Sequence, residues 1–383
     1  MKSVKSQIKN LKKAAERIKK AIKKKERIIL YGDADMDGVS SVIILKEAII
    51  NLGGKVSAIY FPDRETEGYG VNEDALNYLK KYSPALFITV DLGIGNFKEI
   101  KLAKKLGFEV MVVDHHKVLN KLPDAKIIVN PKQKGDKYPF KEFAAAGVVF
   151  KLSEALLDKK MTPALRGNFL ELAALATIAD MMIEEEDNIK IITEGLASLK
   201  STFRPGLQVF AKEGENGSRP MAQKIISACH AGETKEHINE AYFLLTSPSL
   251  EGAESLAVEL SEKSYIRQQR IKVATEEVEK RALKKIEEPI IFEGDKDWPI
   301  LIAAPAASRI CNTYKKPTFL YSQRKNDSQG AVRTPKGIDG VKPMIYCSKY
   351  LETYGGHPQA AGFRIKNKNL GKFQKCLLKY FKI

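Results

Sequence analysis

The chain has 383 residues, 44% of them hydrophobic and 29% charged, so it can form two or three domains with hydrophobic cores. No apolar run approaches the roughly 18–20 residues of a membrane-spanning helix, and no apolar signal core follows the positive N-terminus, so neither a membrane location nor export is expected. The four cysteines are widely spaced without a C-x-x-C pair, which is typical of the reducing cytoplasm.

The N-terminal segment is strongly basic. The net charge is +17, and residues 1–30 hold 12 Lys or Arg against two Glu. Apolar residues recur there at alternating spacings of four and three, which predicts an amphipathic helix with a lysine-rich outer face: Val4, Ile8, Leu11, Ala15, Ile18 and Ile22. This face is either the solvated side of a docking helix or an electrostatic footprint for nucleic acid. An anionic membrane surface is a weaker third interpretation, because the apolar side lacks Trp and Phe.

From residue 27 onward, apolar runs alternate with helical patterns. The runs predict strands over 27–31, 56–61, 85–90, 108–113 and 126–129. The intervening patterns predict helices over 39–51, 72–82 and 96–106. Repeated strand–helix units of this kind indicate a parallel sheet covered on both faces. Ligands of such sheets bind at the carboxyl ends of the strands.

The rest of the chain predicts helices and then a second domain. Residues 144–182 read as buried helices, whereas residues 250–288 contain one glycine and no proline. That stretch predicts a long charged helix ending at Pro289, which fits a connection between two domains better than an exposed coiled coil. We therefore predict an α/β domain over 1–248, a connecting helix over 249–288 and a smaller α+β domain over 289–383.

Carboxylates and histidines follow several of the predicted strands. Asp33 and Asp35 follow the first strand, Asp91 the third, and the Asp114-His115-His116 triplet the fourth, while Asp180 closes an apolar helix. Each aspartate alone is explained by helix capping. Together they supply oxygen and imidazole ligands at one edge of a sheet, which favours a two-metal site for divalent ions.

These motifs resemble a known family. The patterns D-x-D-x-D-G, V-D-x-G-I and D-H-H are similar to those of the DHH phosphoesterase superfamily. The segments "FPDRETEGYGVN" (61–72), "IVNPKQ" (128–133), "FAAAGVVFKL" (143–152) and "GGHPQAAGF" (355–363) resemble its RecJ branch, the single-strand-specific 5′→3′ exonucleases. The resemblance implies that the N-terminal domain is the DHH catalytic domain and that the C-terminal domain is the DHH-associated substrate-binding domain.

The resemblance also implies a ligand set. One ion is expected on Asp35, Asp91, His115 and Asp180, and a second on Asp33, on bridging Asp91 and on a histidine two residues before Asp33. Tyr31 stands at that position, so the second ion is expected to bind loosely. Asp37 is not expected to compensate, because Gly38 indicates that the backbone bends there. The implied ion is Mn²⁺, with Mg²⁺ as an alternative.

Further residues are expected to be catalytic or to contact the substrate. Asp91, His115 and His116 form the implied catalytic centre, with His116 contacting phosphate or supporting the metal ligands. Arg64 is expected to pair with a phosphate, although a surface salt bridge with Glu65 or Glu67 is the alternative. The resemblance implies that Arg333, Gly356 and His357 hold the 5′-terminal phosphate. The sequence departs from the family at two places. Ala331 stands where a serine is usual, and segment 226–233 lacks the family arginine. His230 replaces that arginine if the alignment is in register.

The leading hypothesis is a metal-dependent 5′→3′ exonuclease that releases mononucleotides from single-stranded nucleic acid, with DNA favoured over RNA. A DHH phosphodiesterase for short oligonucleotides or cyclic dinucleotides is the alternative enzyme. The non-enzymatic alternative is a scaffold protein of the replication machinery with a weakened catalytic centre. Replication or repair proteins are expected partners.

Overall fold

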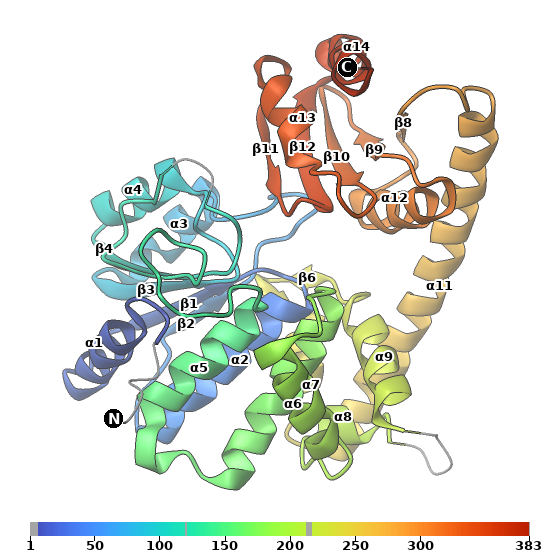
Figure 1. Ribbon diagram of the computed structural model, residues 1–383. Helices are drawn as coiled ribbons and strands as arrows, with labels where there is room; N and C mark the ends of the chain where they lie inside the picture. Colours follow the sequence, from blue (N-terminus) through green and yellow to red (C-terminus); the bar gives the residue numbers. More distant parts are fainter. Residues whose placement is uncertain (1–6, 119–120, 212–216, 383) are drawn as a thin grey trace. The chain divides into compact units, whose positions relative to one another are not determined.

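The computed structural model describes residues 7–118, 121–211 and 217–382. Val4, part of the predicted N-terminal helix, lies outside these ranges. The chain divides into two compact units, Met1–Ser264 and Tyr265–Ile383, and most of their elements are labelled in Figure 1. In the part of the chain that the structure describes, no helix combines the length and the apolar composition needed to cross a bilayer.

A five-stranded parallel sheet forms the centre of the first unit. Its strands are β1 (Ile28–Gly32), β2 (Ala58–Tyr60), β3 (Ala85–Val90), β4 (Phe108–Val113) and β5 (Ile127–Val129). They are ordered β2-β1-β3-β4-β5, and every neighbouring pair is parallel. The predicted α/β class with a parallel sheet is therefore confirmed.

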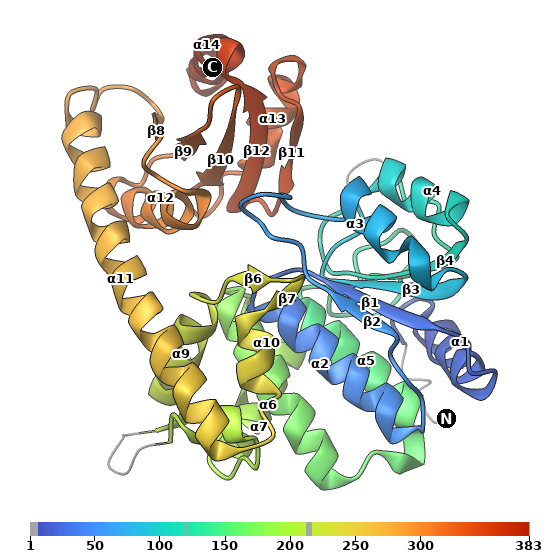
Figure 2. The ribbon, with the colours of Figure 1, turned by 180° about the vertical axis from the view of Figure 1, so that it is seen from behind.

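Both faces of this sheet are covered by helices, because the strands are largely apolar on both sides. Ile28 and Leu30 join one hydrophobic cluster, whereas Ile29 and Tyr31 join another on the opposite face. The first cluster packs against α1 (Leu11–Lys23), α2 (Met36–Asn51) and α5 (Ala145–Leu157), and the second against α3 (Glu73–Leu79) and α4 (Phe97–Lys105). Figures 1 and 2 show the two layers from opposite sides.

The predicted N-terminal helix is confirmed from Leu11 on as α1, which packs its apolar side onto the domain. Ala14, Ile18 and Ala21 are fully buried in the first cluster, and Ile8 just before the helix is also buried. The lysines of α1 occupy the exposed side. Removing this helix would therefore uncover the core as well as remove positive charge.

Further helices extend the first unit beyond α2 and α5. They are α6 (Pro163–Ala179), α7 (Glu186–Leu199), α8 (Pro205–Gln208), α9 (Ser218–Cys229) and α10 (Glu240–Leu245), with a short hairpin of β6 (Thr234–Lys235) and β7 (Ile238–Asn239). Helix α6 is apolar over most of its length and buried from Asn168 to Thr177. Its C-cap is Asp180, the predicted ligand.

The strand order determines where a ligand can bind. From β1 the chain crosses to β2 on one side, and from β3 it crosses to β4 on the other. The loops that follow β1 and β3 therefore diverge and leave a crevice at the carboxyl edge of the sheet. Asp33 and Asp91 lie in these two loops.

The long helix α11 (Leu250–Leu283) contains the boundary between the two units. It ends five residues before the predicted end at residue 288, with a turn over 284–287.

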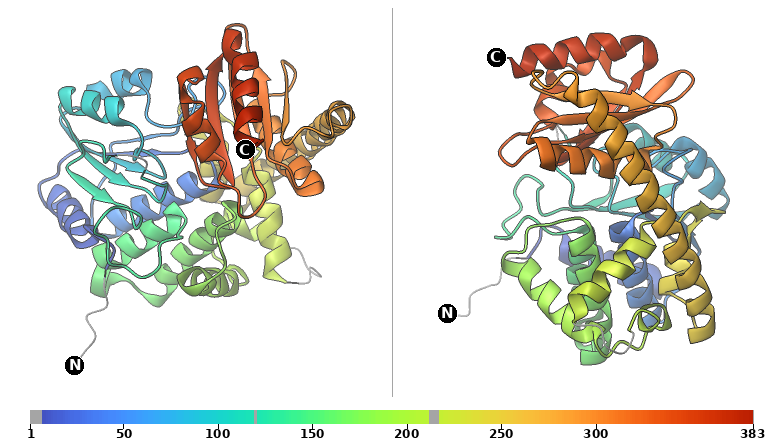
Figure 3. Two further views of the ribbon diagram at one scale, coloured as in Figure 1. Left: turned by 45° about the horizontal axis from the view of Figure 1, so that its top comes forward. Right: turned by 90° about the vertical axis from the view of Figure 1, so that its right-hand side faces the viewer.

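The second unit contains a mixed sheet with helices on both faces. The strands are β8 (Ile291–Asp295), β9 (Thr318–Gln323), β10 (Asp327–Arg333), β11 (Thr353–Gly356) and β12 (Ala360–Lys366), ordered β11-β12-β10-β9-β8. The β8–β9 pair is parallel and the others are antiparallel. One face packs against α12 (Ile300–Tyr314) and the end of α11. The other packs against α13 (Val341–Tyr346) and α14 (Leu370–Phe381), and α14 is seen across that face in Figure 3.

The cysteines depart from the sequence-based expectation. Cys347 and Cys376 form a disulfide, with their Cα atoms 6.0 Å apart, and Cys229 and Cys311 are free. The sequence spacing did not indicate this bond, because the packing of α13 and α14 on one sheet face brings the two residues together. The cysteines therefore do not support the inference of a reducing compartment.

Gly38 lets the first turn of α2 approach the loop after β1. A Cβ atom at this position would lie 2.2 Å from the carbonyl oxygen of Asp33, a separation that only a backbone shift can relieve. We expect Gly38→Ala to lower the free energy of unfolding by about 1–3 kcal/mol, measured by denaturant titration. Gly95→Ala is the matched control, since a Cβ there meets nothing within 4 Å. Equal stability of the two variants would contradict this close contact.

Candidate metal centre

Six side chains converge at the carboxyl edge of the first sheet. Asp33 follows β1, Asp35 is the N-cap of α2, Asp91 follows β3, and His115 follows β4. Asp37 lies in the first turn of α2, and Asp180 is the C-cap of α6. Asp91 belongs to three groups of potential ligands, one with Asp37 and His115, one with Asp33 and Asp35, and one with Asp114 and His116. This shared membership is the geometry expected of a bridging carboxylate.

The tautomer of His115 follows from its neighbours. Its Nδ1 lies 2.7 Å from the carbonyl oxygen of Phe143, which only accepts hydrogen bonds, so Nδ1 carries the proton. In the neutral ring, Nε2 then presents a lone pair. That atom lies 3.2 Å from Asp91 Oδ1 and 3.7 Å from the nearest oxygens of Asp37 and Asp180. A lone pair among three carboxylates is unfavourable without a cation, so the donor set fits a divalent metal.

Buried oxygens in the same cluster support this fit. Asp91 Oδ1 and Asp180 Oδ2 are buried and accept no hydrogen bond from the described residues. Burial, followed by the charge of Asp35, raises the pKa of Asp180 to about 7. Burial and neighbouring aspartates raise the pKa of Asp91 and of Asp37 well above the usual range. Such shifts indicate several negative charges that lack a neutralising cation.

Asp37 is anchored by the N-terminus of α5. Its two carboxylate oxygens accept hydrogen bonds from the backbone N–H groups of Ala145 and Ala146, each at 2.7 Å. The interaction fixes the carboxylate beside Asp91 and His115. Asp37 was not expected to be a ligand, because the bend indicated by Gly38 was expected to direct it away. The helix in fact begins at Met36, and its first turn directs Asp37 into the cluster.

The cluster has two halves. Asp37, Asp91, Asp180 and His115 form one, and Asp33 and Asp35 form the other, where they bind Arg64. The guanidinium donates from Nε to Asp33 Oδ1 at 2.8 Å, and from Nη2 to both Asp33 Oδ2 and, at 2.8 Å, Asp35 Oδ2. Although burial opposes ionisation, the charge of Arg64 and a backbone N–H from Gly38 lower the pKa of Asp35 to about 2. Arg64 thus pairs with these two aspartates and not with Glu65 or Glu67, the alternative expected from the sequence. Its contact with a phosphate stays a prediction.

Tyr31 lies on the α3/α4 face of β1. Its hydroxyl donates to the carbonyl oxygen of Gly70 at 3.1 Å and accepts from Asn72 Nδ2 at 3.3 Å, while its ring stacks on Tyr60. Burial raises the pKa of this phenol well above its ordinary value, so it stays protonated at neutral pH. Tyr31 thus supports the segment after Arg64 and does not present a metal ligand.

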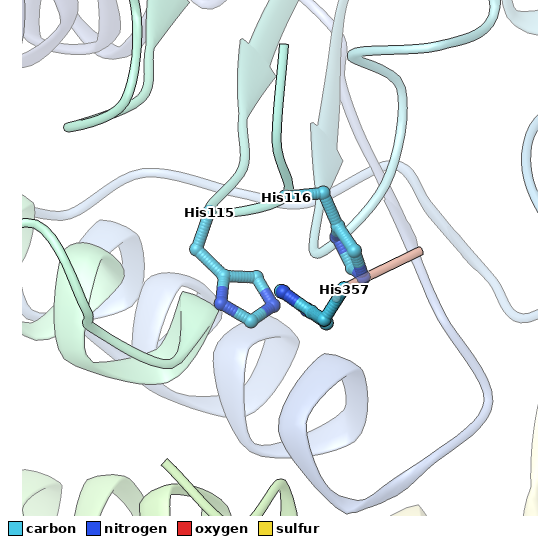
Figure 4. Close-up of side chains that lie close together, drawn as sticks. All are labelled: His115, His116 and His357. Carbon is cyan, nitrogen blue, oxygen red and sulfur yellow. The ribbon is translucent and has the colours of Figure 1, made fainter. Parts of the chain in front are cut away.

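His116 is oriented by the aspartate of the D-H-H triplet. Its Nδ1 lies 2.9 Å from Asp114 Oδ1, which also accepts from the backbone N–H groups of His115 and His116. Burial opposes charging of the ring, but Asp114 outweighs it and raises the pKa of His116 to about 9. Figure 4 shows His115 and His116 side by side after β4, with Tyr69 Oη 3.4 Å from the His116 ring nitrogens. Figure 4 also draws His357, which belongs to the second unit.

Backbone strain accompanies the central carboxylate. Asp91 has a φ of 63°, a left-handed conformation that costs free energy in a residue with a side chain and is retained mainly at functional sites. Its N–H donates to the carbonyl oxygen of Val113, extending the β3–β4 pairing by one residue. The strained turn at the end of β3 thus places the carboxylate between both halves of the cluster.

His230 is also near the cluster. It directly follows α9 and is among the charges that lower the pKa of Asp35. The segment in which the sequence lacks the family arginine therefore still supplies a basic side chain close to Asp35.

The predicted phosphate-binding residues of the second unit lie at one end of its sheet. Arg333 ends β10 and faces Ala360 of β12, and the Gly356-His357 turn joins β11 to β12. Gly356 has a φ of 126°, and a Cβ there would lie 2.6 Å from the carbonyl oxygen of Ala360, so the turn requires glycine. Arg333 Nε donates to Ser308 Oγ of α12 at 2.9 Å.

Ser308 was not identified from the sequence. The family serine is absent at Ala331, yet the hydroxyl of Ser308 lies beside Arg333. Because Ser308 and Arg333 are 25 residues apart and lie on different elements, no local motif could reveal the pair.

The cluster predicts that Asp37 matters as much as Asp91. We expect Asp37→Asn to weaken Mn²⁺ binding by at least the roughly 10–100-fold that removal of a supporting partner costs at metal sites, because it removes a charge that faces His115. Isothermal titration calorimetry measures the effect, with circular dichroism to verify folding. Asp124→Asn, at an exposed ion pair with Lys104, is the control. Wild-type affinity in Asp37→Asn would exclude this residue from the metal centre.

Comparisons with known proteins agree with this geometry. The DHH family, N-terminal domain, matches residues 27–177, and the DHHA1 domain matches residues 272–382. The single-stranded-DNA-specific exonuclease RecJ of Bacillus subtilis (strain 168) is 35% identical over 94% of this chain and 46% of its own length. The corresponding protein of Thermus thermophilus is 32% identical over 93% of this chain and 52% of its own length. The chain thus spans about half the length of these curated relatives.

Solved structures extend the similarity to three dimensions. A crystal structure of exonuclease RecJ bound to manganese has a TM-score of 0.78 at 29% identity and covers 98% of this chain and 95% of that one. RecJ of Thermus thermophilus in complex with Mn²⁺ has a TM-score of 0.84 at 27% identity, over 99% of this chain and 55% of that one. With both domain matches in the expected order, the chain belongs to the DHH family and is a RecJ-like member of it.

Proposed function

We propose that this chain is a divalent-metal-dependent exonuclease that removes mononucleotides from the 5′ end of single-stranded DNA. The observation that carries the proposal is the Nε2 lone pair of His115 among Asp37, Asp91 and Asp180, at the crevice of a parallel sheet. The RecJ relatives are named as single-stranded-DNA-specific exonucleases. Replication or repair proteins that expose 5′-ended strands are the partners that this activity predicts.

The proposed cofactor is Mn²⁺, with Mg²⁺ as an alternative, since related RecJ structures contain one or the other. Asp37, Asp91, His115 and Asp180 would hold one ion, and Asp33, Asp35 and Asp91 border a second position. Divalent ions in such clusters activate water and neutralise phosphate charge. We assign the first position to Asp37 in place of Asp35, because Asp37 groups with Asp91 and His115, whereas Asp35 groups with Asp33 and Asp91.

The proposed reaction is hydrolysis of the first phosphodiester bond. A water oxygen bonds to phosphorus, the bond from phosphorus to the 3′ oxygen of the terminal nucleotide breaks, and that oxygen takes a proton. The shortened strand keeps a 5′-phosphate. In this scheme the chain's own residues bind and orient the substrate. Asp114 fixes the ring of His116 beside Asp91, and the ring contacts the phosphate from there.

The second unit is proposed to hold the terminal phosphate. Arg333 offers a guanidinium at the end of β10, and the Gly356-His357 turn approaches from the paired strand. A guanidinium and closely spaced backbone groups are the chemistry that recognises a phosphate. The site is thus suited to select the 5′ end.

The alternatives are less well supported. A replication scaffold with a weakened centre does not need a buried set of carboxylates facing a histidine lone pair. A phosphodiesterase restricted to short oligonucleotides or cyclic dinucleotides remains distinguishable by substrate length. Hydrolysis of 5′-labelled single strands from 2 to about 40 nucleotides with Mn²⁺ separates the three: the proposal requires products of one nucleotide from every length.

We expect a preference for 5′-phosphorylated strands that depends on Arg333. A charge-assisted hydrogen bond contributes roughly 1.5–3 kcal/mol, so kcat/KM on a 5′-hydroxyl strand should fall about 10–100-fold. In Arg333→Gln the preference should largely disappear. Arg364→Gln, at an exposed ion pair on β12, should keep it. Equal rates on both substrates in the wild type, or degradation from the 3′ end, would contradict the proposed polarity.

The lysines of α1 are expected to add electrostatic affinity for long strands. Because the apolar side of α1 is buried, the test replaces Lys12, Lys13 and Lys20 by Gln and leaves the helix in place. The slope of log affinity against log salt should decrease by about 0.7 for each phosphate that the variant no longer neutralises, measured by fluorescence anisotropy. Replacing Lys98, Lys101 and Lys105 of α4 is the charge-matched control. An unchanged slope in the α1 variant would leave α1 as a structural element only.

A further inference from the structure

The two halves of the carboxylate cluster differ in how their oxygens are used. On Asp33, both oxygens bind Arg64, and Oδ1 also accepts from the N–H of Ala34. On Asp35, Oδ2 binds Arg64, while Oδ1 accepts the N–H groups of Asp37 and Gly38. Every oxygen of these two carboxylates therefore has an internal donor.

In the other half, Asp37 accepts two backbone N–H groups, but two other carboxylate oxygens have no donor in the part of the chain that the structure describes. Asp91 Oδ1 and Asp180 Oδ2 are buried without a donor among the described residues, and His115 Nε2 faces them. In this half the ring of His116 comes only within 3.9 Å of Asp91 Oδ1, whereas in the other half a guanidinium donates directly to both carboxylates. A divalent ion can enter the first half directly, but at the second half it must displace Arg64.

Position 31, two residues before Asp33, does not favour a metal either. Tyr31 takes the position where the family pattern has a histidine, and its hydroxyl is engaged with Gly70 and Asn72. These contacts hold the end of the loop that carries Arg64. Tyrosine in place of histidine at position 31 thus removes a metal ligand. It also supports the segment that carries Arg64, whose guanidinium competes with the metal.

We propose that Arg64 is an exchangeable internal cation at Asp33 and Asp35, so that the substrate-free chain binds one divalent ion tightly and admits a second only when a phosphate draws Arg64 away. This inference rests on the proposed function only in requiring that the cluster binds divalent ions. A guanidinium and a divalent ion compete for the same oxygens, because the fork of Arg64 covers both oxygens of Asp33. A phosphate offers the same bidentate geometry as a carboxylate, so the guanidinium can exchange between them.

Arg64 is also placed to make this exchange. Its side chain is 30% exposed, whereas that of Asp33 is 2% exposed, so Arg64 is the member of this pair that solvent reaches. Arg64 stands in the loop 62–70, between β2 and α3, which contains two turn glycines with positive φ, Gly68 and Gly70. The exchange couples occupancy of the second metal position to the presence of a substrate phosphate.

The experiment counts bound Mn²⁺ by electron paramagnetic resonance of the free ion, without measuring hydrolysis. The wild type should bind one ion tightly and a second at least tenfold more weakly. Arg64→Met should bind the second ion at least tenfold more tightly than the wild type. Arg219→Met, which removes an equal charge at an exposed ion pair with Glu184, should match the wild type.

A second arm adds thymidine 5′-monophosphate as the phosphate probe. It should tighten the second Mn²⁺ site in the wild type and leave Arg64→Met unaffected. This wild-type measurement tests the inference even if Arg64→Met does not fold, and Arg64→Lys, which keeps the charge without the fork, should give an intermediate second affinity.

The outcomes separate this inference from the proposed function. Two equal Mn²⁺ sites in the substrate-free wild type, or the same second affinity in wild type and Arg64→Met, would overturn the role of Arg64 while leaving Mn²⁺-dependent exonuclease activity intact. Equal tightening of the second site by the nucleotide in both proteins would also overturn it. A chain that binds Mn²⁺ as described but does not degrade single strands would instead contradict the proposed function alone.

Discussion

Repulsion among closely spaced carboxylates at the end of one sheet governs the chemistry of the whole site. Asp33, Asp35, Asp37, Asp91 and Asp180 lie at one crevice, and several have raised pKa values because burial and their neighbours oppose ionisation. Such a cluster is stable near neutral pH only with positive charge among its members. The chain supplies part of that charge from Arg64 and His116 and leaves the remainder to a divalent cation.

The fold supports this arrangement through contacts outside the cluster itself. The carbonyl of Phe143 fixes the tautomer of His115, and the N-terminus of α5, only two residues later, anchors Asp37. One loop-to-helix junction thus orients two of the ligands. The carboxylate of Asp114 forms hydrogen bonds with both histidines of the triplet. It also accepts the N–H of Ile94 and so fixes the loop after β3. Rigid support of this kind keeps ligands in position when no ion is bound.

The two units carry chemically different groups. The first concentrates negative charge for a cation, whereas the second presents Arg333 and a glycine turn suited to an anion. Both sites lie where strands end, but for different reasons. In the parallel sheet the connections after β1 and β3 diverge and leave a crevice at the carboxyl edge, while in the antiparallel part of the second sheet a tight turn joins paired strands.

Local sequence patterns were enough to identify many of the elements and the edge at which the site lies. Strands β1 to β5 were predicted within two residues of their observed ends, because a buried parallel sheet requires continuous apolar runs bounded by turns. The aspartates and histidines at their ends were found for the same reason, since strand ends in such a sheet share one edge. The charged helix α11 was visible because it lacks glycine and proline over most of its length.

The partners of these residues, in contrast, became known only from the packing of the folded chain. Asp37 points into the cluster because α2 starts at Met36, and Arg64 binds Asp33 across 31 residues of sequence. The Cys347–Cys376 disulfide and the contact of Ser308 with Arg333 likewise join different elements. A local pattern reports which side chains lie at an edge, because it reflects backbone periodicity. It does not report which of them meet, because that depends on packing between segments distant in the chain.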